Sequence, residues 1–263
     1  MDNKLLNYSL QGNGSAIVLL HGFCESKSIW EQIIPIWSKT FTVISIDLPG
    51  FGGSEICQGQ PSMEQYASDV KKILLHLHIS SCTIIGHSLG GYVALAFAEL
   101  FSQYLKGLVM FHSSAFADSE EKKANRNKTI EFVKTHGTAA FVTTLIPSLF
   151  KESNRKLFAI YINELIAEAS EINPQAIIDA AIAMRDRADR SEVLNGLHIP
   201  VLYVVGKADE AIPMKSSLEQ CHLAKDAHAY FLSNSGHMGM IEEVKNCGKT
   251  ILQFLELCQM EVK

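Results

Sequence analysis

The sequence has little net charge and no basic surplus. Its 263 residues include 23 Lys and Arg against 28 Asp and Glu, which gives a formal charge of −5. Proteins that bind nucleic acids usually carry a basic surplus on one face. The dense basic run at 122–128 lies directly after two glutamates, which favours a solvated helix or loop. The composition therefore predicts no nucleic-acid partner.

Long hydrophobic runs and closely spaced cysteine pairs are also missing. No stretch reaches the roughly 18–20 apolar residues of a membrane helix, and residues 1–14 hold no apolar core of a signal peptide. The 6 cysteines are scattered and form no CxxC pair. We therefore expect no membrane partner and a reduced, cytoplasmic setting. Nothing in these features predicts an oligomeric state.

The chain does contain enough apolar residues for a large core. Hydrophobic residues make up 47% of the sequence and charged residues 19%, and the mean hydropathy is slightly positive. These values exclude a disordered chain, a coiled coil and a collagen-like repeat. The length is typical of one or two domains.

Strands and helices alternate along most of the chain. Continuous apolar runs predict buried strands at 16–20, 41–48, 82–86, 105–111, 200–205 and 227–232. Helical spacing of apolar residues predicts helices at 28–39, 62–78, 90–101, 214–221 and 240–257. Such alternation is typical of βαβ units and predicts an α/β fold with a mainly parallel sheet.

The alternation stops between residues 114 and 190. This block shows helical patterns only, among them 129–134, 157–169 and 174–183. We interpret it as a helical insertion over one end of the sheet. The expected organisation is a core formed by 1–113 and 191–263, with 114–190 inserted as a helical lid.

The strongest chemical signal is Gly86-His87-Ser88-Leu89-Gly90, between a predicted strand and a predicted helix. A G-x-S-x-G sequence in this context forms a sharp nucleophile elbow, which exposes the serine hydroxyl at the N-terminus of a helix. Glycine is needed on both sides because neighbouring backbone comes too close for a Cβ atom. The alternative is an ordinary glycine-rich turn.

A serine hydroxyl needs a base to take its proton. His237 follows the last predicted strand, and Asp209 follows the strand at 200–205, which gives the chain order Ser, Asp, His expected for this arrangement. Glu210 is the local alternative to Asp209 as the acid. The structural histidines are expected to be His76, His78, His198, His222 and His228.

An acyl-transfer site also needs hydrogen-bond donors for the oxyanion. We expect these donors to be the backbone N–H groups of Leu89 and Phe23. His21 is expected to order the loop that carries Phe23, and His87 to pack or line the pocket. Cys24, next to that loop, is either a lining residue or an inert small residue.

Together these segments resemble the α/β-hydrolase superfamily, and in particular its small lid-bearing members similar to serine esterases. The resemblance rests on the segments at 21–23, 47–54, 86–91 and 206–209 together with 236–237. It implies a mostly parallel eight-stranded sheet flanked by helices, a helical lid, and neither a metal nor an organic cofactor. It also implies that an Arg185–Asp186 pair ties the lid to the core.

The resemblance leaves the reaction open, because function is decided at the site. Serine at the elbow argues against haloalkane dehalogenases and epoxide hydrolases, which use aspartate, and against dienelactone hydrolases, which use cysteine. The favoured activity is hydrolysis of a small carboxylic ester by Ser88, His237 and Asp209. C–C bond hydrolases, lyases, perhydrolases and aminopeptidases share these residue types, and some members are ligand receptors with slow turnover. Apolar lid residues are expected partly to wall an acyl pocket: Phe132, Phe141, Leu145, Ile146, Leu149, Phe150, Phe158 and Tyr161.

Overall fold

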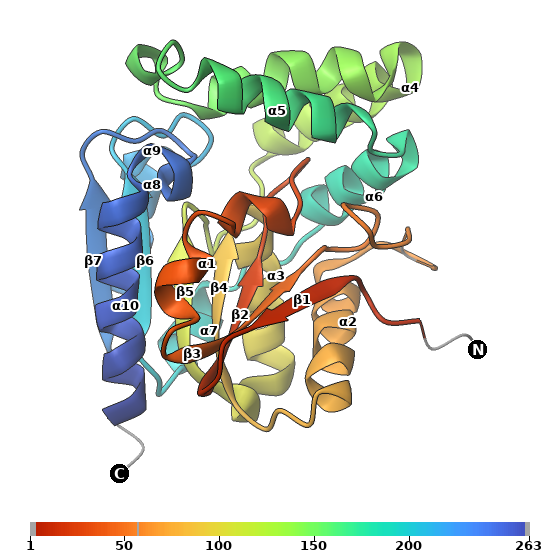
Figure 1. Ribbon diagram of the computed structural model, residues 1–263. Helices are drawn as coiled ribbons and strands as arrows, with labels where there is room; N and C mark the ends of the chain where they lie inside the picture. The colour runs from red at the N-terminus through yellow and green to blue at the C-terminus, as the bar shows by residue number, and fades with distance from the viewer. Residues whose placement is uncertain (1–3, 57, 261–263) are drawn as a thin grey trace.

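The computed structural model describes residues 4–56 and 58–260 and shows a central sheet covered by helices (Figure 1). In the described residues the sheet has seven strands in the order β1-β3-β2-β4-β5-β6-β7. The strands are β1 (Tyr8–Gln11), β2 (Ser15–Leu20), β3 (Phe41–Ile46), β4 (Cys82–His87), β5 (Leu105–Phe111), β6 (Val201–Gly206) and β7 (Ala227–Leu232). All neighbours pair in parallel except β1, which is antiparallel to β3. The parallel α/β fold is confirmed.

The strand number differs from the expected eight. A turn at 12–14 joins β1 directly to β2, which leaves no room for another strand between them. Residues 4–7 form no strand, although the N–H of Asp47 donates to the carbonyl oxygen of Asn7 at 2.9 Å. Seven strands therefore make the sheet of the described chain.

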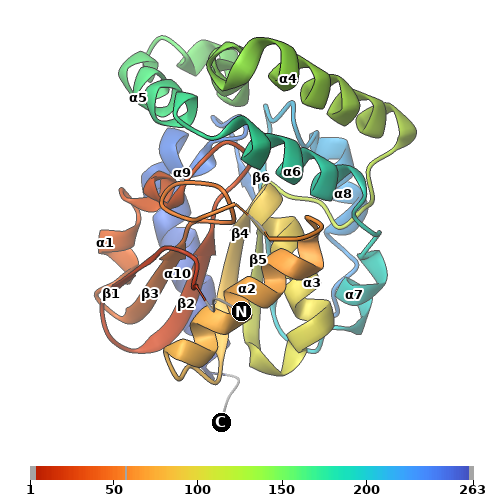
Figure 2. The same cartoon turned by 90° about the vertical axis from the view of Figure 1, so that its right-hand side faces the viewer.

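Helices cover both faces of the sheet (Figures 1 and 2). One face carries α2 (Met63–His76), α3 (Leu89–Phe101) and α7 (Ser191–Gly196), and the other carries α1 (Ile34–Trp37) and α10 (Val244–Met260). Short elements complete the core: η1 (Lys27–Trp30), η2 (Ser102–Tyr104), α8 (Met214–Gln220) and α9 (Gly239–Glu242).

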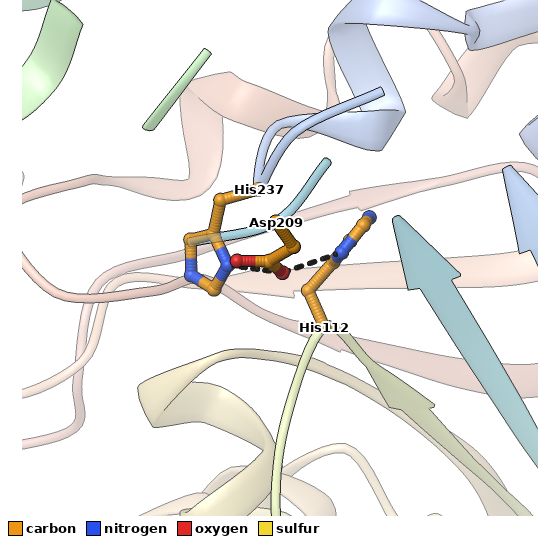
Figure 3. Close-up of side chains that lie close together, drawn as sticks. All are labelled: His112, Asp209 and His237. Carbon is orange, nitrogen blue, oxygen red and sulfur yellow. Dashed lines mark hydrogen bonds and ion pairs between the residues drawn. The ribbon is translucent and has the colours of Figure 1, made fainter. Parts of the chain in front are cut away.

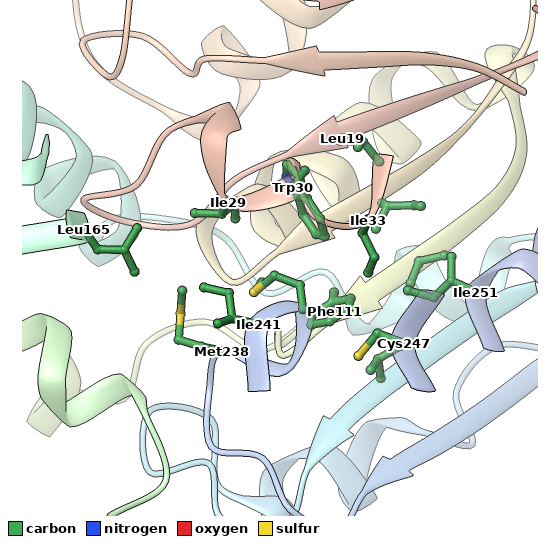
Figure 4. Close-up of a cluster of buried hydrophobic side chains, with 14 of the residues drawn as sticks. Leu19, Ile29, Trp30, Ile33, Phe111, Leu165, Met238, Ile241, Cys247 and Ile251 are labelled. Carbon is green, nitrogen blue, oxygen red and sulfur yellow. The ribbon is translucent and has the colours of Figure 1, made fainter. Parts of the chain in front are cut away.

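Strand β2 shows why the apolar runs are continuous. Ile17 and Leu19 pack into the layer with α1 and α10, whereas Val18 and Leu20 pack into the layer with α2 and α3. Successive side chains of a strand point to opposite faces, so a strand buried on both faces is apolar throughout. Figure 4 shows part of the first layer, in which Leu19, Trp30, Phe111 and Ile251 belong to one buried cluster.

The helix expected at 28–39 is broken into two short pieces, η1 and α1. Pro35 lies in the first turn of α1, where its missing N–H is tolerated. A helix running through from Ser28 would place the proline ring against the carbonyl of residue 31, which is unfavourable. Ile29, Ile33 and Trp37 nevertheless bury the apolar side that the spacing predicted. The last expected helix is likewise divided at Glu243, between α9 and α10.

The helices of the 114–190 block lie over the carboxyl ends of the parallel strands (Figures 1 and 2). They are α4 (Glu120–Leu149), α5 (Ala159–Ser170) and α6 (Pro174–Arg185), with the short η3 (Glu152–Asn154) between α4 and α5. Helix α4 is bent at Gly137, whose φ of 79° and ψ of 175° are not helical. No helix among the described residues is long and apolar enough to cross a membrane.

The expected role of Arg185 and Asp186 is wrong. These neighbours pair with each other at 2.7 Å, and Arg185 also donates to Asn127 in α4, so neither reaches α2 or α3. At this end of the block a link to the core is made instead by buried Arg190, which binds Glu99 in α3 at 3.0 Å and also pairs with Glu64 in α2. An arginine at the end of the block reaches these core helices, whereas Arg185 is still part of α6.

Candidate active site

Ser88 lies in a strained turn between β4 and α3. Its φ of 49° is unusual for a residue other than glycine and is held by the surrounding backbone. Its N–H donates to the carbonyl of Phe111 at 2.9 Å, and its own carbonyl accepts from the N–H of Gly91 at 3.0 Å. A Cβ atom on Gly86 would lie 2.4 Å from the carbonyl oxygen of Gly90, so the turn requires glycine there. This geometry agrees with the elbow that the sequence predicts.

Asp209 and His237 come together at the carboxyl ends of β6 and β7 (Figure 3). His237 Nδ1 lies 2.8 Å from Asp209 Oδ2, while Asp209 Oδ1 accepts from the N–H groups of Ala211 and Ile212, both at 2.9 Å. Glu210 is exposed and points its charge to solvent. The structure therefore places Asp209, rather than Glu210, against the imidazole.

Charge and burial act against each other in this pair. Burial on its own raises the pKa of the Asp209 carboxyl, but the hydrogen-bonded His237 and His112 outweigh it and hold that pKa below its usual range. Burial likewise lowers the pKa of His237, but the Asp209 carboxylate outweighs it and leaves the pKa above its usual value. An ionised Asp209 therefore favours a basic imidazole at His237.

His112 is a third member of this cluster, and sequence reasoning missed it. It follows β5 directly, and its Nδ1 lies 3.0 Å from Asp209 Oδ2 and 3.2 Å from the N–H of Gly206 (Figure 3). A single neutral imidazole nitrogen cannot both donate to Asp209 Oδ2 and accept from the N–H of Gly206. The carboxylate is closer and charged, so we infer that His112 Nδ1 carries a proton and donates it to Asp209. Burial lowers the pKa of His112 to about 4, despite the opposing effect of Asp209. His112 therefore acts as a neutral donor that orients Asp209.

We expect His112 to make unfolding depend on pH. The side chain is neutral in the folded protein down to about pH 4, whereas in the unfolded chain it takes a proton below about pH 6.5. Protonation of His112 in the unfolded chain should therefore lower the free energy of unfolding by about 2 kcal/mol as the pH falls from 6.5 to 5. His237 acts in the opposite direction, because its raised pKa makes the folded state bind a proton more readily than the unfolded chain does.

The measurement is urea unfolding of the unmodified protein and of His112→Gln at pH 6.5 and pH 5. Glutamine keeps a donor for Asp209 but does not titrate, so the variant should lose that part of the pH dependence. The control is His76→Gln on α2. An equal pH dependence in His112→Gln and the unmodified protein would contradict the buried, neutral state of His112.

Of the two expected oxyanion donors, Leu89 follows Ser88 in the chain and Phe23 lines the same cavity as Ser88. Leu89 is the first residue of α3, so its N–H has no partner within the helix. Neither this N–H nor that of Phe23 donates to a protein acceptor in the described part of the chain. His21 orders the loop as expected, because its Nε2 accepts from the N–H of Leu48 at 2.8 Å while its Nδ1 donates to the carbonyl of Gly22 at 2.7 Å.

Glu25 was not identified from the sequence, although it is buried beside the site. Its Oε2 accepts from the N–H of Gly22 at 2.6 Å and lies 2.9 Å from His87 Nδ1. Burial raises the pKa of the Glu25 carboxyl, but the nearby His87 outweighs it and leaves that pKa lowered. His87 Nε2 in turn lies 3.0 Å from the carbonyl oxygen of His237. His87 thus has the packing role expected of it and supports the backbone of His237.

Ser88 and His237 line one small cavity of about 90 Å³ under α4. Its apolar wall includes Leu145, Leu149, Met184, Ala211 and Ile212. Its other polar or aromatic members are Phe23, Glu25, Tyr92 and Arg126. Of the apolar lid residues expected at an acyl pocket, Leu145 and Leu149 line this cavity. Phe141, Ile146, Phe150, Phe158 and Tyr161 belong to or pack against the hydrophobic layer that contains α1 and α10, and Phe132 is 40% exposed.

Cys24 faces a neighbouring cleft instead. It lines a cavity of about 720 Å³ that shares Glu25 with the cavity of Ser88. Burial and the charge of Glu25 raise the pKa of the Cys24 thiol well above its usual value. The thiol therefore stays protonated and is a poor nucleophile.

The cluster of His112, Asp209 and His237 also has the residue types of a metal site. Three potential ligand atoms lie within 4.8 Å of one another. Asp209 Oδ2 already lies within hydrogen-bonding distance of Nδ1 of both imidazoles, so a metal ion at these atoms would have to replace those bonds. The cluster is explained by hydrogen bonding without an ion.

Known proteins resemble this chain over most of its length. It is 26% identical to the 2-hydroxy-6-oxo-6-(2'-aminophenyl)hexa-2,4-dienoic acid hydrolase of Metapseudomonas resinovorans, covering 94% of this chain and 86% of the relative. It is also 26% identical to the pimeloyl-[acyl-carrier protein] methyl ester esterase of Vibrio cholerae, covering 95% and 97%. The solved structure of a thermophilic esterase from Thermogutta terrifontis, with malate bound, matches with a TM-score of 0.92 at 28% identity, covering 96% of this chain and 93% of that one.

The match to a family model agrees with the geometry of the site. The model of the alpha/beta hydrolase fold matches residues 15–244, a span that contains the elbow, Asp209, His237 and the helices above them. With this match and the parallel sheet described above, the chain belongs to the α/β-hydrolase fold family of enzymes.

Proposed function

We propose that the protein is a serine hydrolase that cleaves a small carboxylic ester through an acyl-enzyme, with Ser88 as nucleophile, His237 as base and Asp209 as acid. The observation that carries the proposal is the shared cavity: Ser88 and His237 line it together, and His237 is bonded to Asp209 at 2.8 Å. Nucleophile, base and orienting carboxylate are the three parts of this mechanism.

In the first step, His237 Nε2 takes the hydroxyl proton as Ser88 Oγ attacks the ester carbonyl carbon. The carbonyl oxygen becomes an oxyanion, which the N–H groups of Phe23 and Leu89 would bind. His237 then gives the proton to the leaving alcohol as the C–O bond breaks. The acyl group remains on Ser88 as an ester.

In the second step, water takes the place of the alcohol. His237 accepts a proton from water, the resulting oxygen attacks the acyl carbon, and the proton returns to Ser88 as the acid is released. Asp209 stays ionised throughout and stabilises the imidazolium of His237, in line with its lowered pKa.

The 114–190 block would act as the lid of this site, between the core segments 1–113 and 191–263. Support comes from Leu145 and Leu149 of α4, which cover the cavity of Ser88. A reducing, cytoplasmic setting fits Cys24, Cys82, Cys221 and Cys247, which are free thiols. The substrate is a small molecule, with no cofactor needed for either step.

A second candidate is hydrolysis of a C–C bond. One relative is named as a dienoic acid hydrolase whose substrate carries a keto group, and the two reactions can share the same residues. The two functions differ in the bond cleaved, so release of an alcohol from a simple ester favours the first candidate.

The test is steady-state hydrolysis of p-nitrophenyl esters from acetate to decanoate. We expect many turnovers, with the highest kcat/KM among the two- to four-carbon acyl groups, because the cavity at Ser88 holds only about 90 Å³. A single burst equal to the protein concentration would contradict the hydrolase and favour a ligand receptor. Equal kcat/KM for acetate and decanoate would contradict the small acyl pocket.

A further inference from the structure

Arg126 is a cationic side chain in the cavity of Ser88. It lies on α4 and lines that cavity together with His237 and Tyr92. The proposed reaction uses Ser88, His237, Asp209 and two backbone N–H groups, so it leaves Arg126 without a role. An arginine beside a reacting centre needs its own explanation, because its charge acts on any bound substrate.

Most of the hydrogen-bond donors of the Arg126 guanidinium have no acceptor among the described residues. Its Nε donates to Asp118 Oδ2 at 3.1 Å, whereas Nη1 and Nη2 have no partner within the described residues. Arg187 is different, because it binds the carbonyls of Met184 and Phe116, both at 2.8 Å, and stacks on the ring of Tyr92. Arg187 is a structural arginine, and Arg126 still has two nitrogen atoms available for a ligand.

The ion pairs leave a positive charge at this end of the site. Asp118, which is fully buried, pairs with Arg187 at 2.7 Å and with Arg126 at 3.1 Å, so one carboxylate is shared between two cations. The side chain of Arg126 is only 24% exposed, which reduces the screening of its charge by water.

The neighbouring cleft has the opposite charge. Glu168 and Glu171 line it together with Glu55, which pairs with Lys4, and its described lining contains neither lysine nor arginine. Glu25 lines both cavities and lies against His87. A negative group on a substrate is therefore repelled from that cleft and attracted toward Arg126. The two sides of the site would fix the direction in which an anionic substrate binds.

We propose that the substrate carries a carboxylate that pairs with Arg126, and that the protein therefore prefers anionic esters to neutral ones. This inference rests on the proposed ester hydrolysis at Ser88. The planar guanidinium binds a carboxylate through two parallel hydrogen bonds. The hydroxyl of Tyr92 also makes no hydrogen bond within the described chain and supplies a further donor in the same cavity.

Two matched pairs of esters test the preference, with the released acid measured by titration at constant pH. Monoethyl succinate and ethyl butyrate differ by a carboxylate on the acyl part. The second pair, 4-acetoxybutanoate and butyl acetate, differs by a carboxylate on the alcohol part. We expect kcat/KM to favour the anionic ester by about tenfold or more in one pair. That pair identifies the part of the substrate beside Arg126.

Variants assign the preference to its residue. Arg126→Gln should reduce the anionic-to-neutral ratio of kcat/KM by about tenfold. Arg126→Lys should keep part of the ratio, because lysine retains the positive charge but lacks the two parallel N–H donors of the guanidinium. Lys134→Gln is the matched control, since it removes one exposed charge from the same helix. Tyr92→Phe removes a single hydroxyl and should lower the ratio by a smaller factor.

The outcomes separate this inference from the proposed function. No hydrolysis of any of the four esters by the unmodified protein would contradict the proposed function itself. If the protein hydrolyses both members of each pair, and neither Arg126→Gln nor Lys134→Gln changes the anionic-to-neutral ratio of kcat/KM, the proposed function stands while the role of Arg126 is overturned. A ratio that falls equally in both variants would also overturn it, because a general charge effect would then suffice.

Discussion

Ser88→Ala should lower the kcat for ester hydrolysis by about four orders of magnitude or more, since loss of a serine nucleophile removes the acyl-enzyme route. The substitution removes only Oγ, which forms no hydrogen bond to the described residues. Alanine also keeps the Cβ atom at the strained φ of 49°. We therefore expect unchanged circular dichroism and a free energy of unfolding within about 0.5 kcal/mol of the unmodified protein.

The matched control for this variant is Cys24→Ala, which removes the other nucleophilic side chain close to the site. Cys24 lines the neighbouring cleft, and its raised pKa keeps the thiol protonated. Its loss should change kcat by no more than a few-fold. Full activity in Ser88→Ala would contradict the proposed mechanism. Inactivity of Cys24→Ala together with activity of Ser88→Ala would assign the chemistry to the thiol instead.

Most of the sheet is predictable because a strand that is buried on both faces appears in the sequence as a continuous apolar run. Strands β2 to β6 are largely buried apolar runs, and β7 is a largely apolar edge strand of which only Leu232 is buried; six strands were expected at these places. Strand β1 is different, since its residues Tyr8–Gln11 are only half-buried or exposed. Such an edge strand is stabilised by backbone hydrogen bonds to β3 rather than by a run of apolar side chains, and no pattern of hydrophobicity reveals it.

The elbow was predictable because its requirements are local. The strain at Ser88 and the close backbone at Gly86 involve residues that are neighbours in sequence, so a short motif contains them. His237 and Asp209 could be assigned because each follows a strand whose carboxyl end must reach the same edge of the sheet. The hydrogen bond between them agrees with that topology.

The remaining polar contacts depend on long-range geometry. His112 meets Asp209 across 97 residues, and Glu25 meets His87 across 62. The position of His112 directly after β5 was a usable signal, because β5 pairs with β4 and ends beside the elbow. Nothing local distinguishes Arg126 from the other charged residues of α4, since its place at the cavity depends on how that helix crosses the sheet.

Asp209→Asn should lower kcat/KM by about a thousandfold or more, through the proton on His237 rather than through loss of the fold. The N–H groups of Ala211 and Ile212 both donate to Oδ1, so the amide oxygen of asparagine takes that position. Its NH₂ group then faces His237 Nδ1, which must accept. The proton of the neutral imidazole moves to Nε2, and Nε2 can no longer take the proton of Ser88.

The pH profile of this variant tests the same reasoning independently. In the unmodified protein the Asp209 carboxylate raises the pKa of His237, and hydrolysis requires the neutral imidazole, so activity falls with acidification through that raised pKa. Without the carboxylate the acid limb of kcat/KM should move to lower pH. Glu210→Gln removes a charge from the adjacent, exposed residue and should leave both the rate and the acid limb unchanged. If Glu210→Gln is instead the variant that loses activity and shifts the limb, Glu210 rather than Asp209 is the acid that orients His237.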